Sequence, residues 1–389
     1  MKKRTLATCS TVHAVHDGLQ DVSYVLLPLL AQSFGLSLAQ VGVIRGAHRA
    51  AMAAFQIPAG LIAERFGERN LLALGTLVVG LAFLALGYAP GFWAILAALF
   101  FAGLGSSVQH PLSSTIISHA FATEGRRAAL GTYNFAGDVG KFAFGAIVSL
   151  LLLAGISWQA PVVGFGVIAL LAGGAVLLLV SDTSSSAQTR KDAPARAAGW
   201  GIRDRQGFTV LCLIEILDSS TRAGFLTFIA FLLIERGLSA GWAASAVPLV
   251  FVGGMAGKLA CGLLAERLGV VRMIVITEVA TACGIFAVLA LPAGGAFLLL
   301  PLLGVVLQGT SSVLYATVGE FVEPDRLPRT FGFFYTIGSV CGIAAPLGYG
   351  MLGDRYGVGV AIATMGVLIL LTVPLAALLK PRYAAAPQG

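Results

Sequence analysis

The stretch GLIAERFGER at residues 60–69 decides how the chain is interpreted, because it occurs twice. GLLAERLGVVR at residues 262–272 repeats it 202 residues later, and FGLS at 34–37 returns at the same displacement as RGLS at 236–239. Each copy of the longer stretch follows an apolar run and places an acidic and a basic residue beside a glycine. The repeat therefore predicts two homologous halves, and two such halves within a membrane are typical of a secondary transporter.

The composition assigns these halves to a lipid environment. Hydrophobic residues make up 57% of the 389 residues, charged residues make up 11%, and the mean hydropathy is +0.90. Soluble proteins carry about 25% charged residues. Apolar runs of ~20 residues recur along the chain, which is the length that a membrane-spanning helix needs, and long uninterrupted runs favour helices over a barrel. We expect an all-α membrane protein with about twelve transmembrane helices, near 8–32, 39–64, 70–89, 92–121, 128–154, 160–181, 208–234, 241–266, 271–291, 296–321, 330–353 and 358–379.

A polar, basic segment at 182–206 separates six expected spans from six. It predicts an N-terminal half at 1–181, a cytoplasmic linker at 182–206 and a C-terminal half at 207–389. Nearly all basic residues outside the spans fall on the linker side of the membrane. By the positive-inside rule, both termini are then cytoplasmic, in the inner (cytoplasmic) membrane of a cell, and the first span is uncleaved. This placement accounts for the net charge of +7 without nucleic acid as a partner.

The repeated turn resembles the loop signature of the major facilitator superfamily. Within that superfamily, HDGLQDVSYVLLPLL at 16–30, GLGSSVQHPLSS at 103–114 and the region from YATVGEFV at 315–322 to GMLGDRYGV at 350–358 are similar to the fosmidomycin-resistance type of efflux transporter. The resemblance implies that the first, fourth, seventh and tenth helices line a central path. It also implies a gating latch formed by the motif residues Gly60, Glu64, Arg65 and Arg69, with Gly262, Glu266 and Arg267 in the second half. The family usually has Asp at the position of Glu64, and Ala146 stands where its antiporters often have Pro, which weakens the inference of exchange.

The first span carries an unusual number of polar residues. His13, Asp17, Gln20 and Tyr24 share one helical stripe, with His16 and Asp21 beside it. A charge near the bilayer centre costs roughly 3 kcal/mol, so this stripe is expected to face a wet cavity or charged partners. A carboxylate here could carry a coupling proton, and a histidine could respond to pH or bind a metal ion. Alternatively, these groups only neutralise basic residues on other helices.

Further polar residues lie inside other spans. We expect Asp218 and Arg222 to pair along one helix, and Asp138 to pair with Lys141. The repeat displacement aligns Glu215 with His13. Pro111 removes a backbone hydrogen bond in the fourth span, which either breaks the helix and places His110 at a cavity or only kinks the helix for packing. The candidate substrate or proton sites beyond the first span are Arg45, His48, Arg49, His110, Asp138, Lys141, Glu215, Asp218, Arg222, Gln308 and Tyr315, whereas Glu278 has no assigned role.

The sequence contains no nucleotide-binding or hydrolase signature, so an enzyme is not expected. The basic residues at membrane depth favour a small anionic organic compound or drug, and the carboxylates favour proton-coupled export by alternating access. We expect a monomer that needs only the bilayer, its substrate and the proton gradient, with no cofactor. The alternative within transport is a copper or iron transporter with ligands from His13, His16, Asp17, His48 and Met52. A membrane sensor that moves no solute is the alternative outside transport.

Overall fold

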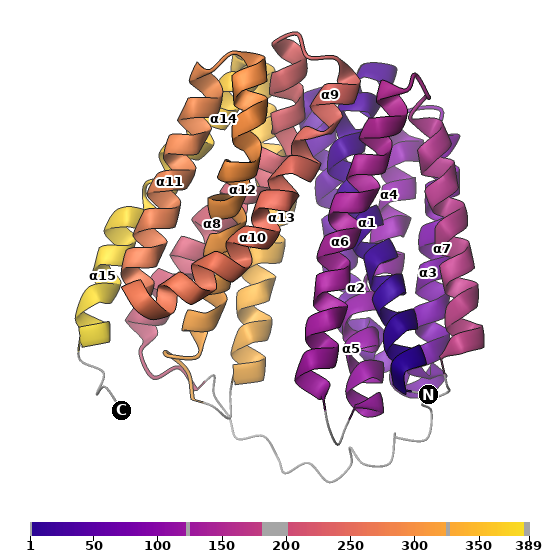
Figure 1. Ribbon diagram of the computed structural model, residues 1–389, viewed down its shortest axis with the longest axis horizontal. Helices are drawn as coiled ribbons and strands as arrows, with labels where there is room; N and C mark the ends of the chain where they lie inside the picture. Colours follow the sequence, from indigo (N-terminus) through magenta and orange to yellow (C-terminus); the bar gives the residue numbers. More distant parts are fainter. Residues whose placement is uncertain (1, 122–124, 181–200, 324–326, 385–389) are drawn as a thin grey trace. The chain divides into compact units, whose positions relative to one another are not determined.

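The computed structural model describes residues 2–121, 125–180, 201–323 and 327–384, with the side chains at 57, 60, 61, 64, 126, 127, 327–329 and 380–384 left aside. Within these ranges the chain is helical almost throughout (Figure 1). The first part contains α1 (Lys2–Phe34), α2 (Leu38–Phe66), α3 (Glu68–Gly87), α4 (Phe92–Ser106), α5 (Gln109–Ala120), α6 (Arg126–Leu153) and α7 (Gln159–Leu179). The second part contains α8 (Arg205–Glu235), α9 (Ala240–Ala244), α10 (Ala246–Leu268), α11 (Val270–Ala290), α12 (Ala293–Val318), α13 (Leu327–Tyr356), α14 (Val358–Ile369) and α15 (Thr372–Ala384).

These helices confirm the expected all-α membrane fold. Ten stretches of the described residues are long and apolar enough to cross a bilayer. The other two expected spans, α1 and α2, are 33 and 29 residues long and carry the polar residues noted in the sequence. The helices therefore correspond to twelve spans, with α4 and α5, α9 and α10, and α14 and α15 each forming one interrupted span.

The interruptions lie close to prolines. A proline at position i cannot donate to the carbonyl at i−4 and crowds it. α4 ends just before Ser107, four residues ahead of Pro111, so the helix is broken, which is one of the two alternatives from the sequence. α9 ends four residues before Pro248, and α14 ends five residues before Pro374. The spans predicted at 241–266 and 358–379 are present as Ala240–Leu268 and Val358–Leu379. Their interruption was not predicted, although these two prolines have the same effect as Pro111.

The repeated turn has the same backbone form in both halves. Gly67 follows α2 and Gly269 follows α10, and each has φ of +84°. Only glycine adopts this left-handed conformation without strain. The glycine in each copy of the motif thus ends one helix and lets the next begin immediately.

The chain is divided into two units by its internal contacts. The N-terminal unit contains α1, α3–α7, most of α2 and the short α9, and the C-terminal unit contains α8, α10–α15 and the first turn of α2. The linker predicted at 182–206 lies outside the described residues up to residue 200.

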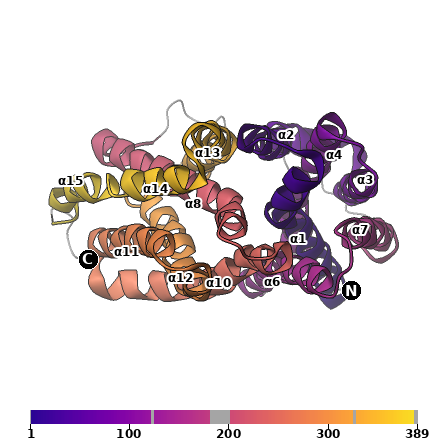
Figure 2. The same ribbon diagram turned by 90° about the horizontal axis from the view of Figure 1, so that it is seen from above.

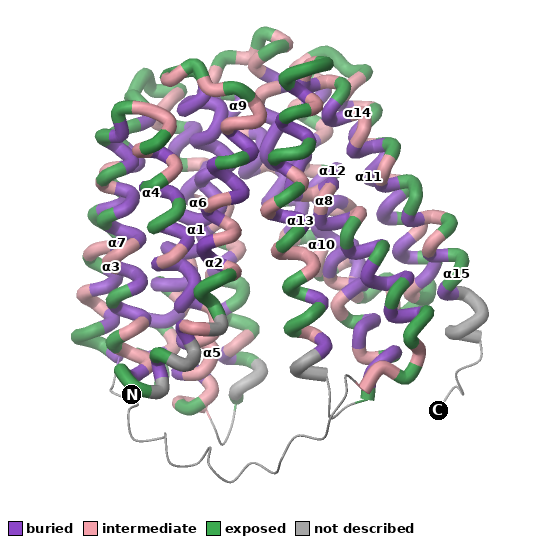
Figure 3. The backbone as a smooth tube through the Cα atoms, turned by 180° about the vertical axis from the view of Figure 1, so that it is seen from behind, coloured by how far each residue is buried: buried purple, intermediate pink, exposed green. Residues whose placement is uncertain are grey.

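The most polar spans are the innermost helices of their units. In the N-terminal unit α1 packs against α5, α6 and α7, as Figure 2 shows for α6 and α7. Every residue from Val15 to Ala31 is buried, and Figure 3 shows α1 largely in the colour of buried residues. In the C-terminal unit α8 packs against α12, α13, α14 and α15. The polar side chains of α1 and α8 therefore face protein and not lipid.

Candidate functional site

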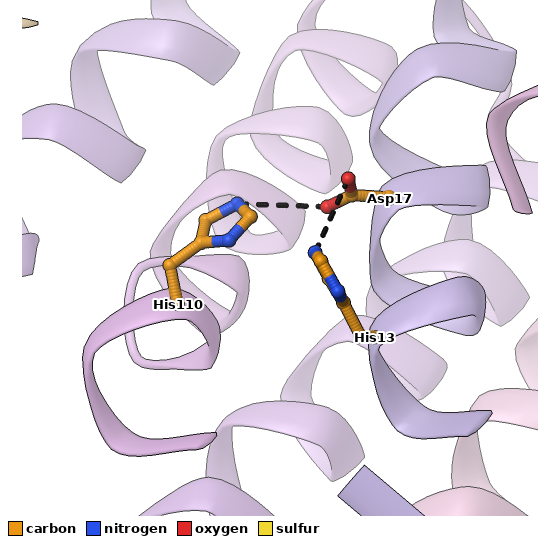
Figure 4. A group of neighbouring side chains, drawn as sticks. All are labelled: His13, Asp17 and His110. Carbon is orange, nitrogen blue, oxygen red and sulfur yellow. Dashed lines mark ion pairs between the residues drawn. The ribbon is translucent and has the colours of Figure 1, made fainter. Parts of the chain in front are cut away.

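A charged cluster in the N-terminal unit is centred on the Asp17 carboxylate of α1. Its Oδ2 lies 3.2 Å from Nζ of Lys141 on α6 and 3.3 Å from Nε2 of His13. Its Oδ1 lies 3.5 Å from Nε2 of His110, near the start of α5. Figure 4 shows both imidazoles directed at the Asp17 carboxylate. Lys141 also pairs with Asp138 at 3.3 Å, as the spacing predicted.

His13 is fixed in one orientation. Its Nδ1 lies 2.8 Å from the backbone carbonyl oxygen of Tyr133, which can only accept, so Nδ1 carries a proton. The imidazole ring of His13 and the phenol ring of Tyr133 stack, with their centroids 3.9 Å apart. In a neutral imidazole Nε2 then has a lone pair that points at the Asp17 carboxylate, which is also an acceptor. The contact at 3.3 Å becomes favourable when a proton lies between the two groups.

Gly137 on α6 makes room for this pair. A Cβ added there would lie 2.6 Å from Cε1 of His13 and 2.8 Å from Oδ2 of Asp17. These distances are shorter than van der Waals contact. The cluster therefore depends on a residue without a side chain at this point of α6.

The cluster is open on one side. His13 and Asp17 are 3% and 5% exposed at their side chains, whereas Lys141 is 23% and His110 is 40% exposed. The accessible members are Lys141 and His110, which present N–H groups, and Asp138, whose carboxylate is 21% exposed. An acceptor that enters from this side can reach the ammonium and the imidazole, whereas the Asp17 carboxylate lies deeper.

A second buried pair lies further along α1. Arg45 of α2 donates to the carbonyl oxygen of Gln20 at 3.1 Å and to Oγ of Ser23 at 2.7 Å. Its guanidinium lies 3.5 Å from Oδ1 of Asp21 and 3.7 Å from the centre of the Tyr24 ring. Arg45 thus neutralises Asp21 and fixes α2 against α1. For these two residues, this contact is the structural alternative to a role in substrate or proton binding.

His16 and His48 are directed away from the Asp17 cluster. Nε2 of His16 bonds Oγ1 of Thr76 at 2.9 Å, and the Thr76 hydroxyl itself donates to Leu72. Nδ1 of His48 bonds the carbonyl oxygen of Leu99 on α4 at 2.9 Å. Each histidine therefore donates to a neighbouring helix in its own unit.

The predicted metal ligands are thus divided. In the described part of the chain, the ligand group with mutual reach is His13, Asp17 and His110, within 4.8 Å of one another. The Lys141 ammonium already contacts the same carboxylate, and a metal ion would have to compete with it. Such a site would differ from the predicted one, because His110 replaces His16 and His48.

The C-terminal unit carries a matching cluster on α8. Arg222 pairs with Asp218 at 2.9 Å, as predicted, and donates to Oγ of Ser219 at 2.9 Å. The Ser219 hydroxyl donates in turn to Oε1 of Glu215 at 2.5 Å. Ser219 therefore links the guanidinium to the second carboxylate.

The two clusters are built alike. Glu215 and Ser219 follow His13 and Asp17 by 202 residues. Gly338 of α13 lies against these two residues as Gly137 of α6 lies against His13 and Asp17. A Cβ at Gly338 would lie 2.9 Å from Oε1 of Glu215, 3.3 Å from Oγ of Ser219 and 4.0 Å from the Tyr315 hydroxyl. Each unit thus packs its polar helix against a glycine.

The structure also describes Gln308, Arg49 and part of the gating motif. Gln308 packs its side chain over Gly254 of α10, and Arg49 is half-buried with an Nε that has no hydrogen-bond partner among the described residues. Among the gating residues, Arg65, Glu266 and Arg267 are exposed, Arg69 lies beside Asn70, and Gly262 is half-buried. The side chains at Gly60 and Glu64 lie outside those that the structure describes, so the latch stays a prediction.

Sequence reasoning missed four members of the clusters, Tyr133, Gly137, Ser219 and Gly338. The glycine spacing at 131–146 and its echo at 332–347 was a usable signal for the two glycines. Tyr133 contributes its backbone carbonyl to the hydrogen bond with His13, and no pattern in the sequence indicates such a contact.

Comparison with known proteins gives a consistent result. The family model of the Major Facilitator Superfamily matches residues 10–346. The “Probable 4-methylmuconolactone transporter” of Cupriavidus pinatubonensis is 24% identical over 93% of this chain and 86% of its own length. The 3-(3-hydroxy-phenyl)propionate transporter of Escherichia coli is 22% identical over 95% of this chain and 94% of its own. A bacterial homologue of the human lysosomal transporter Spinster, solved inward-facing and unoccupied, has the same fold with a TM-score of 0.85 at 16% identity over 99% of both chains.

The family match, the relatives and the fold agree with the arrangement of polar clusters inside long apolar helices. A multi-pass membrane protein that carries small molecules, without enzymatic activity, accounts for all of them. The chain belongs to the Major Facilitator Superfamily of membrane transporters.

Proposed function

We propose that the protein is a proton-coupled secondary transporter of small organic acids that works by alternating access. The observation that carries the proposal is the Lys141 ammonium, which is 23% exposed and held between the carboxylates of Asp17 and Asp138. A cation in this position can exchange one carboxylate for that of a substrate. His110, at 40% exposure, supplies a second donor on the same side.

Proton coupling follows from the same contacts. When a substrate carboxylate accepts from Nζ of Lys141, Asp17 loses its strongest partner. An unpaired carboxylate in a buried site is unfavourable, so Asp17 takes up a proton, which His13 is placed to share at 3.3 Å. Substrate binding and proton uptake are thereby linked at one carboxyl group.

The relatives support an organic acid as the substrate. One is named for a methylmuconolactone and another for a hydroxyphenylpropionate, and both match this chain over nearly its whole length. The similarity to the fosmidomycin-resistance type and the direction of export stay predictions of the sequence. The placement in the inner membrane with cytoplasmic termini and the monomeric state are likewise part of the proposal.

Thermal unfolding of the purified protein with added 3-(3-hydroxyphenyl)propionate tests the proposal. A ligand at 100 times its Kd stabilises the folded state by about 2.7 kcal/mol. We expect the acid to raise the melting temperature and its neutral amide to leave it unchanged. Lys141→Gln should lose the shift and Lys141→Arg should keep part of it. The same substitution at Lys258, half-buried on α10, is the control and should keep the shift. No shift with this acid, benzoate or a hexuronate would refute the organic-acid proposal.

Metal transport is the second candidate, because three possible ligands approach within 4.8 Å. The same assay with copper, iron, zinc and manganese ions separates it from the first. A shift with a metal ion that disappears in both His13→Ala and His110→Ala would favour this candidate. A metal-induced shift that survives in both variants would exclude this site as its origin.

A further inference from the structure

Glu278, in the middle of α11, is a buried acid that the proposed mechanism does not use. Its side chain is fully buried, and neither Oε1 nor Oε2 has a hydrogen-bond partner among the described residues. Three residues along the same helix, Thr281 is also buried, with a hydroxyl that has no partner there. Buried polar groups nearly always have hydrogen-bond partners, so two adjacent ones without partners require an explanation.

In the part of the chain that the structure describes, the charges that act on Glu278 come from α8. They belong to Asp218, Arg222 and Glu215, the members of the C-terminal cluster. α11 packs against α12 and α14, and both of these also pack against α8. Within Val358–Ile369 α14 has no titratable side chain, and Tyr315 is the only one in α12. The Glu278 carboxyl therefore belongs electrostatically to the α8 cluster.

The remaining neighbours of α11 supply no cation to Glu278 in the described part of the chain. α10 carries Cys261 and Lys258, with Glu266 and Arg267 at its exposed end. The charged side chains of α15 lie outside the described residues. None of these groups is among those whose charges act on Glu278.

The charges of the cluster do not balance when every acid is ionised. Three carboxylates would then surround one guanidinium. Arg222 is committed to Asp218 at 2.9 Å, and Glu215 accepts from the Ser219 hydroxyl. Among the described residues, Glu278 has neither a paired cation nor a hydrogen-bond donor, and like charges in a dry site do not all ionise. A proton on one Glu278 oxygen halves the excess negative charge of the cluster, from two to one, and neutralises the acid that has no partner.

We infer that Glu278 is a proton-binding site of the C-terminal unit, whose occupancy depends on the partner of Arg222. While Arg222 pairs with Asp218, the proton is on Glu278. When Arg222 turns to Glu278, the proton passes from the Glu278 carboxyl to the Asp218 carboxylate. Asp218 then carries the proton, and Glu278 is paired with the Arg222 guanidinium. This inference rests on the proposed proton coupling and adds a second site to it.

Infrared difference spectroscopy of the full-length protein in lipid nanodiscs tests the inference without any substrate. The carbonyl absorption of a protonated carboxylic acid should be present in the wild type and lost in Glu278→Gln. Glu235→Gln, the same change at an exposed position at the end of α8, should keep it. Asp218→Asn should remove the Glu278 absorption, because Arg222 then lacks the Asp218 carboxylate and pairs with Glu278 instead. An unchanged absorption in Glu278→Gln would overturn the inference, and an unchanged absorption in Asp218→Asn would overturn the exchange.

Two further arms complete the test. Replacing choline by sodium should leave the Glu278 absorption unchanged, and its loss in sodium would make Glu278 a sodium ligand instead. In proteoliposomes Glu278→Gln should lose at least tenfold in accumulation of 3-(3-hydroxyphenyl)propionate driven by a pH gradient. It should retain at least half of the wild-type exchange of labelled for unlabelled acid, and loss of both activities to the same degree would overturn the coupling role. If the wild type carries no organic acid, the proposed function fails, while the infrared result still decides the proton on Glu278.

Discussion

Gly137→Ala is the change that most sharply tests the geometry of the Asp17 cluster. The added methyl group would lie 2.6 Å from Cε1 of His13, so the imidazole has to move by about 1 Å to reach normal contact. Such a movement strains the 2.8 Å bond to the Tyr133 carbonyl and the contact with Asp17. The substitution therefore adds a methyl group to a filled site and weakens a buried hydrogen bond.

The magnitude follows from three opposing contributions. Overpacking costs about 1–3 kcal/mol, and the weakened hydrogen bond costs about 1 kcal/mol. Alanine gains about 1 kcal/mol over glycine inside a helix. The net loss of unfolding free energy is then about 1–3 kcal/mol. Gly131→Ala on the same helix meets nothing within 4 Å, so it should gain up to about 1 kcal/mol.

The assay is unfolding of both variants in the same detergent, together with transport in liposomes. The account predicts that Gly137→Ala is less stable than Gly131→Ala by about 2–4 kcal/mol and transports more slowly. Equal stability and equal transport of the two variants would refute the reasoning. Loss of stability with full transport would show that the cluster is structural only.

Three further outcomes are expected. Gly338→Ala should impair transport, because its methyl group would meet Glu215. Gly332→Ala on the same helix has open space around the added methyl group and should leave transport unchanged. Similar transport rates of the two variants would contradict this expectation. Arg236→Ala should lower the unfolding free energy by about 1–2 kcal/mol in denaturation experiments, because Arg236 donates to three carbonyls at the end of α11, and Arg236→Lys should recover part of it. Arg45→Met should cost about 3 kcal/mol by leaving Asp21 buried without its cation, and unchanged stability would show that this pair is dispensable.

The sequence predicted the parts of the fold that depend on local pattern. Apolar runs of the right length gave the spans, and the recurrence of one turn gave the two halves. The pairs Asp138–Lys141 and Asp218–Arg222 were predicted because both partners lie on one helix turn. Such contacts depend on helical spacing alone.

Contacts between helices were harder to predict. The sequence placed Asp17, His110 and Lys141 in three spans as separate candidates, and only the packing of α1, α5 and α6 shows that they meet. His16 and His48 had the same appearance in sequence as His13, yet His16 bonds Thr76 and His48 bonds Leu99, and only His13 of the three pairs with Asp17. Whether a histidine reaches the Asp17 cluster depends on how its helix is rotated toward its neighbours. That rotation cannot be predicted from a single sequence.

The most direct test of the central claim is uptake of labelled 3-(3-hydroxyphenyl)propionate into proteoliposomes with and without an imposed pH gradient. The account predicts accumulation that requires the gradient in the wild type, is lost in Lys141→Gln and is partly retained in Lys141→Arg. Accumulation that does not depend on the pH gradient, or that is undiminished in Lys141→Gln, would contradict the claim that an organic anion and a proton both bind at the Asp17–Lys141 pair.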